Sequence, residues 1–536
     1  MKLLRLLVGF IAVLLVVAGA TVAVLLGPDD TWGGEPEAVP DARPVIVSGP
    51  QLLDVAGLSL VVTARPAGGG AAFVGAGHPV HVQDYVRDVA RTEITALSAS
   101  GVGDSQALSG ERQRPAVAPG ELDVWQEQAT GDPATIEVPL TEDAPVQIAA
   151  AQATGAGEAP EVGIGYALPG AFVGGLVAVL IGVLLLAGTI VLGRRAKGVD
   201  SAASEAAPQP SRTSSGTALR LAAVGSVIAL ATGCSIPQRV DHGAEPGVVP
   251  LVEAELSAVL EDYDERNNAA IKASHSGDGS LWASADTGPH LAIDEVAAKY
   301  NAVKKPKGKA SPFHHIGEAV FAPQQASYPL WSVVQYSDPE ASDDEGAGLK
   351  VVTRERVSEP WRSYSGTWVD GDVPTPLPGE RATPSAADID RAEEVDTLLG
   401  TWLESGQVDG LEVTESLERS RASAMKKQKG ITRYVSSSRP WGAADDERTE
   451  QGGPVRAVRV EEGLLVLTDR AWEIRMHLDG DYVWTPSTVE REVYGYRAEA
   501  TVKALRYTLT TAILVPDSGD ARVIGSSAER VREFAR

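Results

Sequence analysis

The chain has 536 residues, enough for three or four domains, and 43% of them are hydrophobic, which is sufficient for packed cores. Its formal net charge of −25 argues against nucleic-acid binding, because that function relies on a basic surface. The single cysteine excludes an intramolecular disulfide.

Two long apolar runs predict membrane-spanning helices at residues 3–26 and 169–193, because each has the roughly 20 apolar residues that cross a bilayer. Lys2 and Arg5 precede the first run, and further basic residues follow the second. Such residues are retained on the cytoplasmic side of a membrane. Residues 27–168 carry six arginines and twenty acidic residues, and we therefore expect them outside. A cleaved signal peptide is the alternative interpretation of the first run.

Residues 27–168 are predicted to form a small β-rich, antiparallel domain. Short runs of alternating or β-branched residues, separated by glycine and proline, are typical of such a fold. A short helix is expected at residues 79–90. The expected strands lie at residues 58–65, 71–74, 93–97, 122–126, 135–140 and 146–150.

Several short motifs follow one another through this region: Phe73-Val74-Gly75, Tyr85-Val86, residues 89–93, a strand with Trp125, and residues 163–169 leading into the second apolar run. On these motifs, residues 1–197 resemble a group of uncharacterised actinobacterial membrane proteins with two helices. The resemblance implies a membrane topology and no activity.

Cys234 ends the string Leu-Ala-Thr-Gly-Cys, which is how a bacterial lipoprotein signal ends. The apolar run before it, residues 221–230, has the length of a signal-peptide hydrophobic region rather than of a membrane span. We expect residues 217–236 to be a lipoprotein-type signal and Cys234 to be lipidated. A cytoplasmic linker at 194–216 precedes this segment and a tether at 237–248 follows it. The alternative is a third membrane helix over the same residues.

The C-terminal region is predicted to be a tandem pair of α+β units, residues 249–372 and 384–536. In each unit a helix with an apolar stripe comes first, a lysine-rich turn follows, and strand-like runs complete the unit. This order is typical of cystatin-like or NTF2-like domains. The region is acidic, and we expect it outside the membrane as well. The lysines of the two turns are Lys304, Lys305, Lys307 and Lys309, then Lys426, Lys427 and Lys429.

The second unit should begin at a capping pair, Ser385 with Asp388, because such a pair marks the start of a helix. Antiparallel strands are expected after its helices. They lie at residues 455–460, 464–468, 472–478, 482–486, 491–496, 501–515 and 521–524.

The string from Leu260 to Ala269, the first lysine-rich turn and a strand with Trp361 carry a second resemblance. With them, residues 217–536 resemble uncharacterised actinobacterial lipoproteins, whose lipidated cysteine lies where Cys234 lies here. The membrane segment in front departs from that group. The chain is therefore similar to two neighbouring envelope proteins fused into one.

No catalytic constellation, metal-binding motif or cofactor motif stands out in the sequence. His314-His315 lacks a third ligand at metal spacing, and His78 with His81 has only aspartates after it. We interpret His314-His315 as a solvated strand entrance, and His78 with His81, one helical turn apart, as at most a weak metal site that we do not expect to be used. The two lysine-rich turns are candidate sites for anionic lipid heads or cell-wall polymer.

These features predict a non-enzymatic protein of the cell envelope, multi-pass, with outward domains that bind or scaffold. Its expected partners are the membrane, envelope proteins or cell-wall polymer. The alternative is an NTF2-like enzyme with a pocket in the sheet. A deep cavity with converging His, Asp or Tyr side chains would favour the enzyme, whereas a sheet filled by aromatic side chains would favour surface binding.

Overall fold

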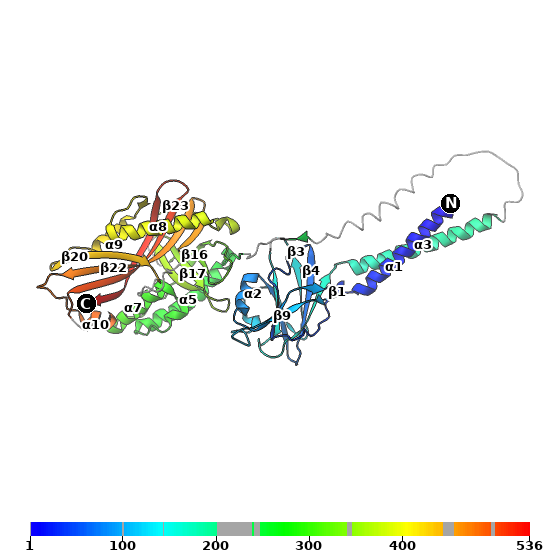
Figure 1. The fold of residues 1–536 in the computed structure, drawn as a ribbon, viewed down its shortest axis with the longest axis horizontal. Helices are drawn as coiled ribbons and strands as arrows, with labels where there is room; N and C mark the ends of the chain where they lie inside the picture. Colours follow the sequence, from blue (N-terminus) through cyan, green and yellow to red (C-terminus); the bar gives the residue numbers. More distant parts are fainter. Residues whose placement is uncertain are drawn as a thin grey trace. The chain divides into compact units, whose positions relative to one another are not determined.

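The computed structural model divides the chain into two compact units, Met1–Pro246 and Gly247–Arg536 (Figure 1). The expected lipoprotein-type signal at 217–236, Cys234 included, lies outside the described residues. The structure describes residues 2–98, 101–142, 144–200, 238–240, 247–339, 346–442, 455–494 and 499–535.

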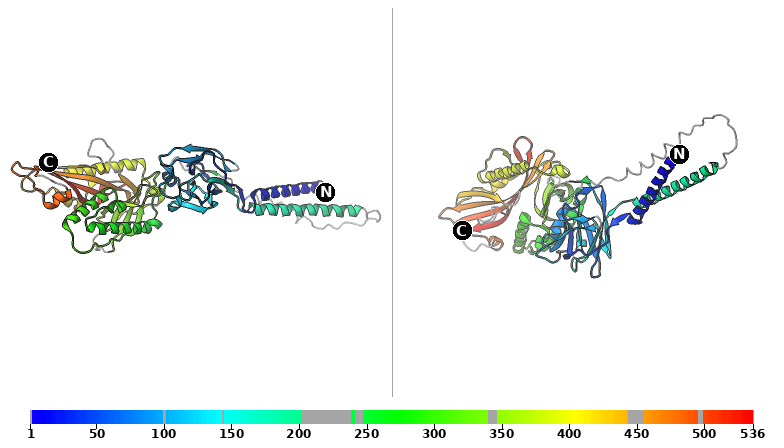
Figure 2. Two further views of the ribbon diagram at one scale, coloured as in Figure 1. Left: turned by 90° about the horizontal axis from the view of Figure 1, so that it is seen from below. Right: turned by 45° about the vertical axis from the view of Figure 1, so that its right-hand side comes forward.

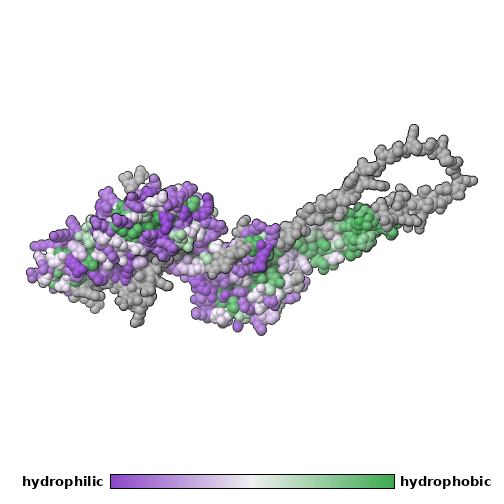
Figure 3. Space-filling view, turned by 45° about the horizontal axis from the view of Figure 1, so that its top comes forward, coloured by the Kyte–Doolittle hydropathy of each residue, from purple (hydrophilic) through white to green (hydrophobic). Residues whose placement is uncertain are grey.

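Among the residues that the structure describes, two helices are long and apolar enough to cross a membrane, at the two runs that the sequence predicts. Helix α1 (Lys2–Leu26) contains the apolar stretch Leu6–Leu26, and helix α3 (Ala171–Asp200) contains Ala171–Val191. Most of their apolar side chains are exposed, and Figure 3 shows a hydrophobic surface along them. Such a surface suits a lipid environment.

Glycines set the contact between these two helices. A Cβ atom on Gly19 would lie 2.5 Å from the carbonyl oxygen of Gly175, and one on Gly182 would lie 2.7 Å from that of Ala12. Only glycine therefore permits this approach of the two backbones, as in other membrane helix pairs. Asp30 accepts hydrogen bonds from the amides of Gly170 and Phe172, at 2.8 and 2.6 Å, and so caps the start of α3.

The chain segment that connects these two helices folds as a β sandwich of a four-stranded and a six-stranded sheet (Figure 2). Val62 and Ile164 of the first sheet share a core with Val74 and Ile148 of the second. The first sheet has the order β1 (Thr31–Gly33), β13 (Glu161–Ala167), β4 (Leu58–Arg65), β11 (Ala134–Leu140). The second has the order β10 (Trp125–Gly131), β5 (Ala72–Gly77), β12 (Gln147–Gln152), β2 (Val45–Ser48), β6 (Arg91–Ile94), β9 (Ser105–Leu108).

The smaller elements of this unit join the sandwich at its edges. Helix α2 (Pro79–Val86) is shorter than the predicted helix at 79–90. Strand β14 (Gln238–Arg239), within the expected tether, pairs with β3 (Val55–Ala56). The remaining elements are β7 (Leu97–Ser98), β8 (Gly101–Val102) and the 3-10 turn η1 (Pro119–Glu121).

The first half of the second unit places helices before a four-stranded antiparallel sheet. Its helices are α5 (Glu253–His275), α6 (Trp282–Ala285) and α7 (Gly288–Lys304). The strands pair in chain order, because short connections join antiparallel neighbours. They are β15 (Ile316–Phe321), β16 (Leu330–Ser337), β17 (Gly348–Arg354) and β18 (Arg362–Trp368).

The second half repeats this order with longer strands. Helix α8 (Ala386–Ser405) begins at the expected capping pair, because the Ser385 hydroxyl accepts from the Asp388 amide and Asp388 accepts in return. The main sheet has the order β19 (Leu411–Glu412), β24 (Ala521–Ala535), β23 (Val502–Pro516), β22 (Gly463–Leu478), β20 (Ile431–Pro440). The other elements are η2 (Gly379–Ala382), α9 (Glu415–Ala424), β21 (Arg456–Val460), which pairs with β22, and α10 (Thr488–Tyr494).

The two halves are built on one common core. Alternate residues of β22 face opposite ways: Leu464 and Val466 pack with α8, whereas Leu465 and Leu467 pack with Phe321 and its neighbours in the first sheet. The unit is therefore layered as helices, sheet, sheet and helices (Figure 2). Such a shared core makes the predicted tandem pair a single compact body.

Several of the expected strands of the second unit are wrong in detail. In the run 482–486 only Trp484 forms a bridge, with Ala500, and no strand forms there. The runs 464–468 and 472–478 form one continuous strand, β22, because Asp469 and Arg470 find buried partners and do not break it. The expected strand at 491–496 is instead helix α10. Ser487 and Glu490 form a reciprocal cap at its start, with bonds of 2.8 and 3.2 Å.

Candidate functional site

A cavity of about 460 Å³ lies in the first half of the second unit, between helices α5 and α7 and the face of the sheet that they cover. Its size falls within the range of small-molecule sites. Aromatic walls are provided by Tyr263, Trp282, Phe313, Tyr336 and Trp368. Polar lining groups are Asn267, His290, Asp294, Asn301, His315 and Lys350.

One side of this pocket carries a chain of three buried polar side chains. Asp264 of α5 accepts from the backbone amide of His315 at 2.8 Å, and its other oxygen lies 2.5 Å from Nδ1 of the same residue. Nε2 of His315 lies 2.6 Å from Nζ of Lys350 in strand β17. With the Nδ1 hydrogen donated to Asp264, Nε2 accepts from the ammonium group, and the three groups form a continuous relay.

Burial sets the charge states of this relay. It lowers the pKa of Lys350 from 10.5 to about 8, although Asp286 and Asp264 act in the opposite direction. Burial and the nearby Lys350 charge also lower the pKa of His315 to about 4. The ammonium of Lys350 lies 4.3 Å from the ring centre of Tyr263, a cation–π contact that partly replaces water. A buried lysine of lowered pKa is suited to accept or release a proton near neutral pH.

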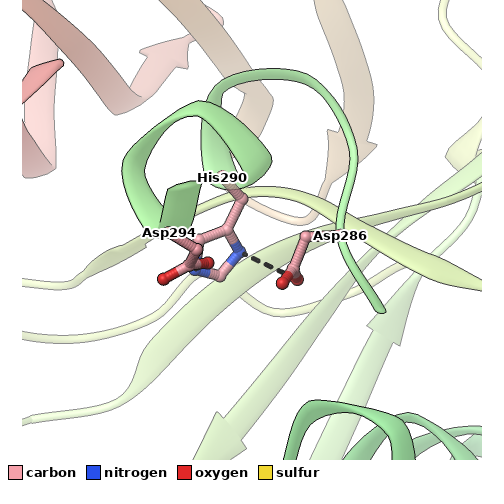
Figure 4. Close-up of side chains that lie close together, drawn as sticks. All are labelled: Asp286, His290 and Asp294. Atoms are coloured by element: carbon pink, nitrogen blue, oxygen red, sulfur yellow. Dashed lines mark ion pairs between the residues drawn. The ribbon is translucent and has the colours of Figure 1, made fainter. Parts of the chain in front are cut away.

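A second group of side chains lies at the start of α7. Asp286 lies in the extended segment before the helix, whereas His290 and Asp294 lie one turn apart on α7, and the three side chains come together (Figure 4). Nδ1 of His290 lies 3.7 Å from Asp286, and Nε2 lies 3.9 Å from Asp294. The hydroxyl of Tyr263 donates to Asp286 at 3.1 Å.

This second group holds ionisable side chains with strongly altered protonation. Burial, followed by the charge of Asp286, raises the pKa of Asp294 to about 8. Burial likewise raises the pKa of Asp286 to about 6, and Lys350 opposes that rise. Burial lowers the pKa of His290 and keeps its imidazole neutral at pH 7. Altered pKa values in a cavity are a feature of functional sites.

The lysine-rich turns predicted from the sequence lie on the surface, outside the relay. Lys304, Lys305, Lys307 and Lys309 are all exposed, as are Lys426, Lys427 and Lys429. The first turn borders the pocket, because Ala310 lines it and the Gly308 carbonyl lies 3.1 Å from Nε2 of the pocket residue His275. The second turn follows α9, and its Lys426 carbonyl accepts from Tyr434.

The candidate histidines differ in their positions. His314 is exposed as predicted, but His315 is buried in the relay, which corrects its interpretation as a solvated residue. His78 caps α2 by accepting from the Val80 amide at 3.3 Å. A structural role at a helix start accounts for that residue.

Sequence reasoning missed Asp264, Asp286, His290, Asp294 and Lys350. Two signals were present in the printed sequence. His290 and Asp294 are spaced to lie one helical turn apart, and a third possible ligand, Asp286, stands four residues before His290. Lys350 interrupts an apolar strand, where a charged residue needs a buried partner.

Replacement of Lys350 by methionine should change how stability depends on pH. Between about pH 8 and 10.5 the unfolded chain holds the lysine proton and the native chain releases it, so the wild-type free energy of unfolding rises with pH. Relative to Lys350→Met, the wild type should gain roughly 3 kcal/mol across this window. Urea unfolding of both proteins as a function of pH, with a chelator to remove stray metal ions, measures this difference in the free energy of unfolding. The exposed Lys307→Met change should leave the profile unaltered.

The comparisons with known proteins bear on the whole of the second unit. No curated protein matches the chain. The family described as "Domain of unknown function (DUF8094)" matches residues 249–534, which is more than half of the chain and contains both α+β halves with the pocket. The chain therefore belongs to the DUF8094 family of domains of unknown function.

Proposed function

We propose that this chain is a membrane-anchored binding protein that holds a small polar ligand in the pocket of its first α+β half. The observation that carries the proposal is the pocket itself, where aromatic walls surround buried Asp, His and Lys side chains. Ligand sites combine apolar walls with a few convergent polar groups in this way. Helix-then-sheet order around such a pocket supports likeness to cystatin-like or NTF2-like domains.

The proposed location is the outer face of a bacterial cell membrane, with both large regions extracytoplasmic. The support is the charge distribution: basic residues flank the apolar helices, and acidic regions lie beyond them. The chain would be an actinobacterial envelope protein, and lipidation of Cys234 would add an anchor before the second unit. Two acyl chains hold a protein stably at a membrane.

Fusions of alkaline phosphatase test this topology, because the enzyme folds only outside the cytoplasm. A fusion after Gly120 or after Arg536 should be active, and a fusion after Ala207 should be inactive. The charge distribution is the reason, since residues 193–220 carry five basic and two acidic groups. Activity at Ala207 would overturn the proposed orientation.

The pocket chemistry favours a ligand with ring faces and several hydroxyl or amide groups. Aromatic side chains offer flat apolar surfaces, and Asn267, Asn301 and Asp294 offer donors and acceptors beside them. A saccharide unit of the cell-wall polymer has this chemistry. The exposed lysine-rich turn at the pocket border would attract the anionic parts of such a polymer.

Titration of the full chain in detergent with disaccharide-peptide fragments from muramidase-digested peptidoglycan tests this proposal. Tryptophan fluorescence should change on binding, because Trp282 and Trp368 line the pocket. Trp368→Ala should weaken binding by at least tenfold, whereas Trp32→Ala, in the other unit and exposed, should not. Equal affinity in both variants would place the binding elsewhere.

An acid–base enzyme is the second candidate, favoured by the Asp264–His315–Lys350 relay. A lysine with a pKa of about 8 can exchange a proton at neutral pH, and His315 links it to a carboxylate. Mass spectrometry of the fragments after incubation distinguishes the two candidates. Turnover that is lost in Lys350→Met while binding persists would indicate the enzyme. If wild-type protein left the fragments chemically unchanged, the result would favour the binding protein over the enzyme.

A further inference from the structure

Asp286, His290 and Asp294 form a compact group of ligand-type atoms. One oxygen or nitrogen atom from each residue lies within 4.8 Å of the others. Figure 4 shows that the imidazole of His290 lies between the two carboxyl groups. Helix α7 supplies His290 and Asp294, and the short segment between α6 and α7 supplies Asp286.

Asp286 carries an independent sign of a missing partner. Its side chain is fully buried, and Oδ2 has no hydrogen-bond partner within the part of the chain that the structure describes. The other oxygen accepts from Tyr263. A buried carboxylate oxygen without a partner is costly, because it has lost its water and gained nothing in exchange. A cation at this oxygen would provide the absent interaction.

His290 is oriented as a metal ligand would be. Its Nδ1 lies 2.6 Å from the hydroxyl of Ser363, a buried residue of β18. With the hydrogen on Nδ1 donated to Ser363, the lone pair of Nε2 points to the side of Asp294. Metal-bound histidines commonly donate their other ring hydrogen to such a partner, which fixes both tautomer and ring orientation.

The ionisable groups around the pocket can also carry a net negative charge that a cation would balance. Asp264, Asp286 and Asp294 bring three carboxyl groups to one ammonium group, that of Lys350. The neighbouring Asp262 is paired with Arg266 at 2.7 Å and adds no net charge. A cation would displace the proton of the Asp294 carboxyl, since metal ligands must be deprotonated, and with both histidines neutral three ionised carboxylates and one lysine then leave two negative charges. A divalent cation balances them.

We propose that Asp286, His290 and Asp294 bind a divalent transition-metal cation of the Zn²⁺ or Mn²⁺ type. One imidazole nitrogen and two carboxylate oxygens are a donor set that such ions accept. His290 and Asp294 line the pocket, so the coordination positions not filled by protein face the cavity. An ion held by three protein ligands can polarise a ligand oxygen there. This site does not depend on the identity of the pocket ligand.

The test uses the full chain in detergent, stripped with a chelator and titrated separately with Zn²⁺ and Mn²⁺ in a calorimeter. The background carries Cys234→Ala, because a free thiol competes for zinc. One equivalent of metal per chain should bind. His290→Ala and Asp294→Asn should each weaken binding by about 100-fold or more, since even supporting residues account for ~10–100-fold.

Two exposed residues of the same types provide matched controls. His314→Ala removes an exposed histidine next to the pocket, and Asp390→Asn removes an exposed aspartate on α8, so both should bind as the parent does. Circular dichroism checks that each variant is folded, and Asp294→Asn keeps the shape of the side chain. Absence of a bound equivalent, or unchanged affinity in folded Asp294→Asn and His290→Ala, would overturn the metal site. Either result leaves the fragment-binding test of the pocket unaffected.

Discussion

Replacing Arg470 with methionine is expected to lower the free energy of unfolding by about 3–5 kcal/mol, because it leaves a buried carboxylate without its partner. Nη1 of Arg470 donates to Asp396 of α8 at 2.5 Å, and Nε donates to the hydroxyl of Ser438 at 2.7 Å. Both charged side chains are less than one-tenth exposed. Gly400 leaves the space for this arginine, since a Cβ there would lie 2.5 Å from Nη2.

Urea unfolding measures the effect, and strand β22 offers its own control. Arg475 lies on the same strand with its side chain 57% exposed, and it pairs with Glu473 at 2.6 Å. Arg475→Met should therefore change stability by less than ~1 kcal/mol. The double change Arg470→Met with Asp396→Leu should recover part of the loss, because it removes both buried charges. Equal effects of the Arg470 and Arg475 changes would contradict this assignment.

Replacing Asp264 with leucine should have a comparable effect, about 3–5 kcal/mol, because it disrupts the relay inside the pocket. The change removes the acceptor for two groups of His315 and leaves Lys350 with one fewer buried counter-charge. Asp264 raises the pKa of Lys350, so its loss should lower that pKa further. In the Asp264→Leu variant, the pH window in which the free energy of unfolding rises should then begin below pH 8.

The control for this change lies on the same helix. Asp262 has a side chain that is 58% exposed and pairs with Arg266, so Asp262→Asn should alter stability by less than ~1 kcal/mol. Asp264→Asn should lie between the two, because the amide oxygen can still accept from the His315 backbone. Thermal and urea unfolding measure the stability of the three variants. If Asp264→Leu left the free energy of unfolding unchanged, the relay would contribute nothing to stability.

Local patterns predict the elements of this fold well where one principle dominates. The apolar runs at α1 and α3 follow from length and hydrophobicity alone, and the Ser385–Asp388 pair marks the start of α8. The strand expected at 491–496 is wrong because the Ser487–Glu490 cap begins helix α10 there, although Val493 and Tyr494 have high β propensity.

The shared core and the site could not be read from local patterns, because distant residues create them. Ser365 donates to Asp469 at 3.0 Å across the two sheets, over a separation of 104 residues. The relay likewise joins Asp264 to His315 and Lys350 from three separate elements. Amino-acid composition does not tell which residues of two distant segments lie opposite each other. Local signals were limited to the spacing of Asp286, His290 and Asp294 and to Lys350 inside an apolar strand.

The most direct test of the proposed binding pocket is mass spectrometry of the small molecules that the full chain carries when it is purified from its own membranes. Wild-type protein and the exposed-surface control Trp32→Ala should release the same compound, in an amount close to one per chain. The pocket variant Trp368→Ala should release at least tenfold less of it. Identical small-molecule contents in all three proteins would contradict the assignment of this cavity as the functional site.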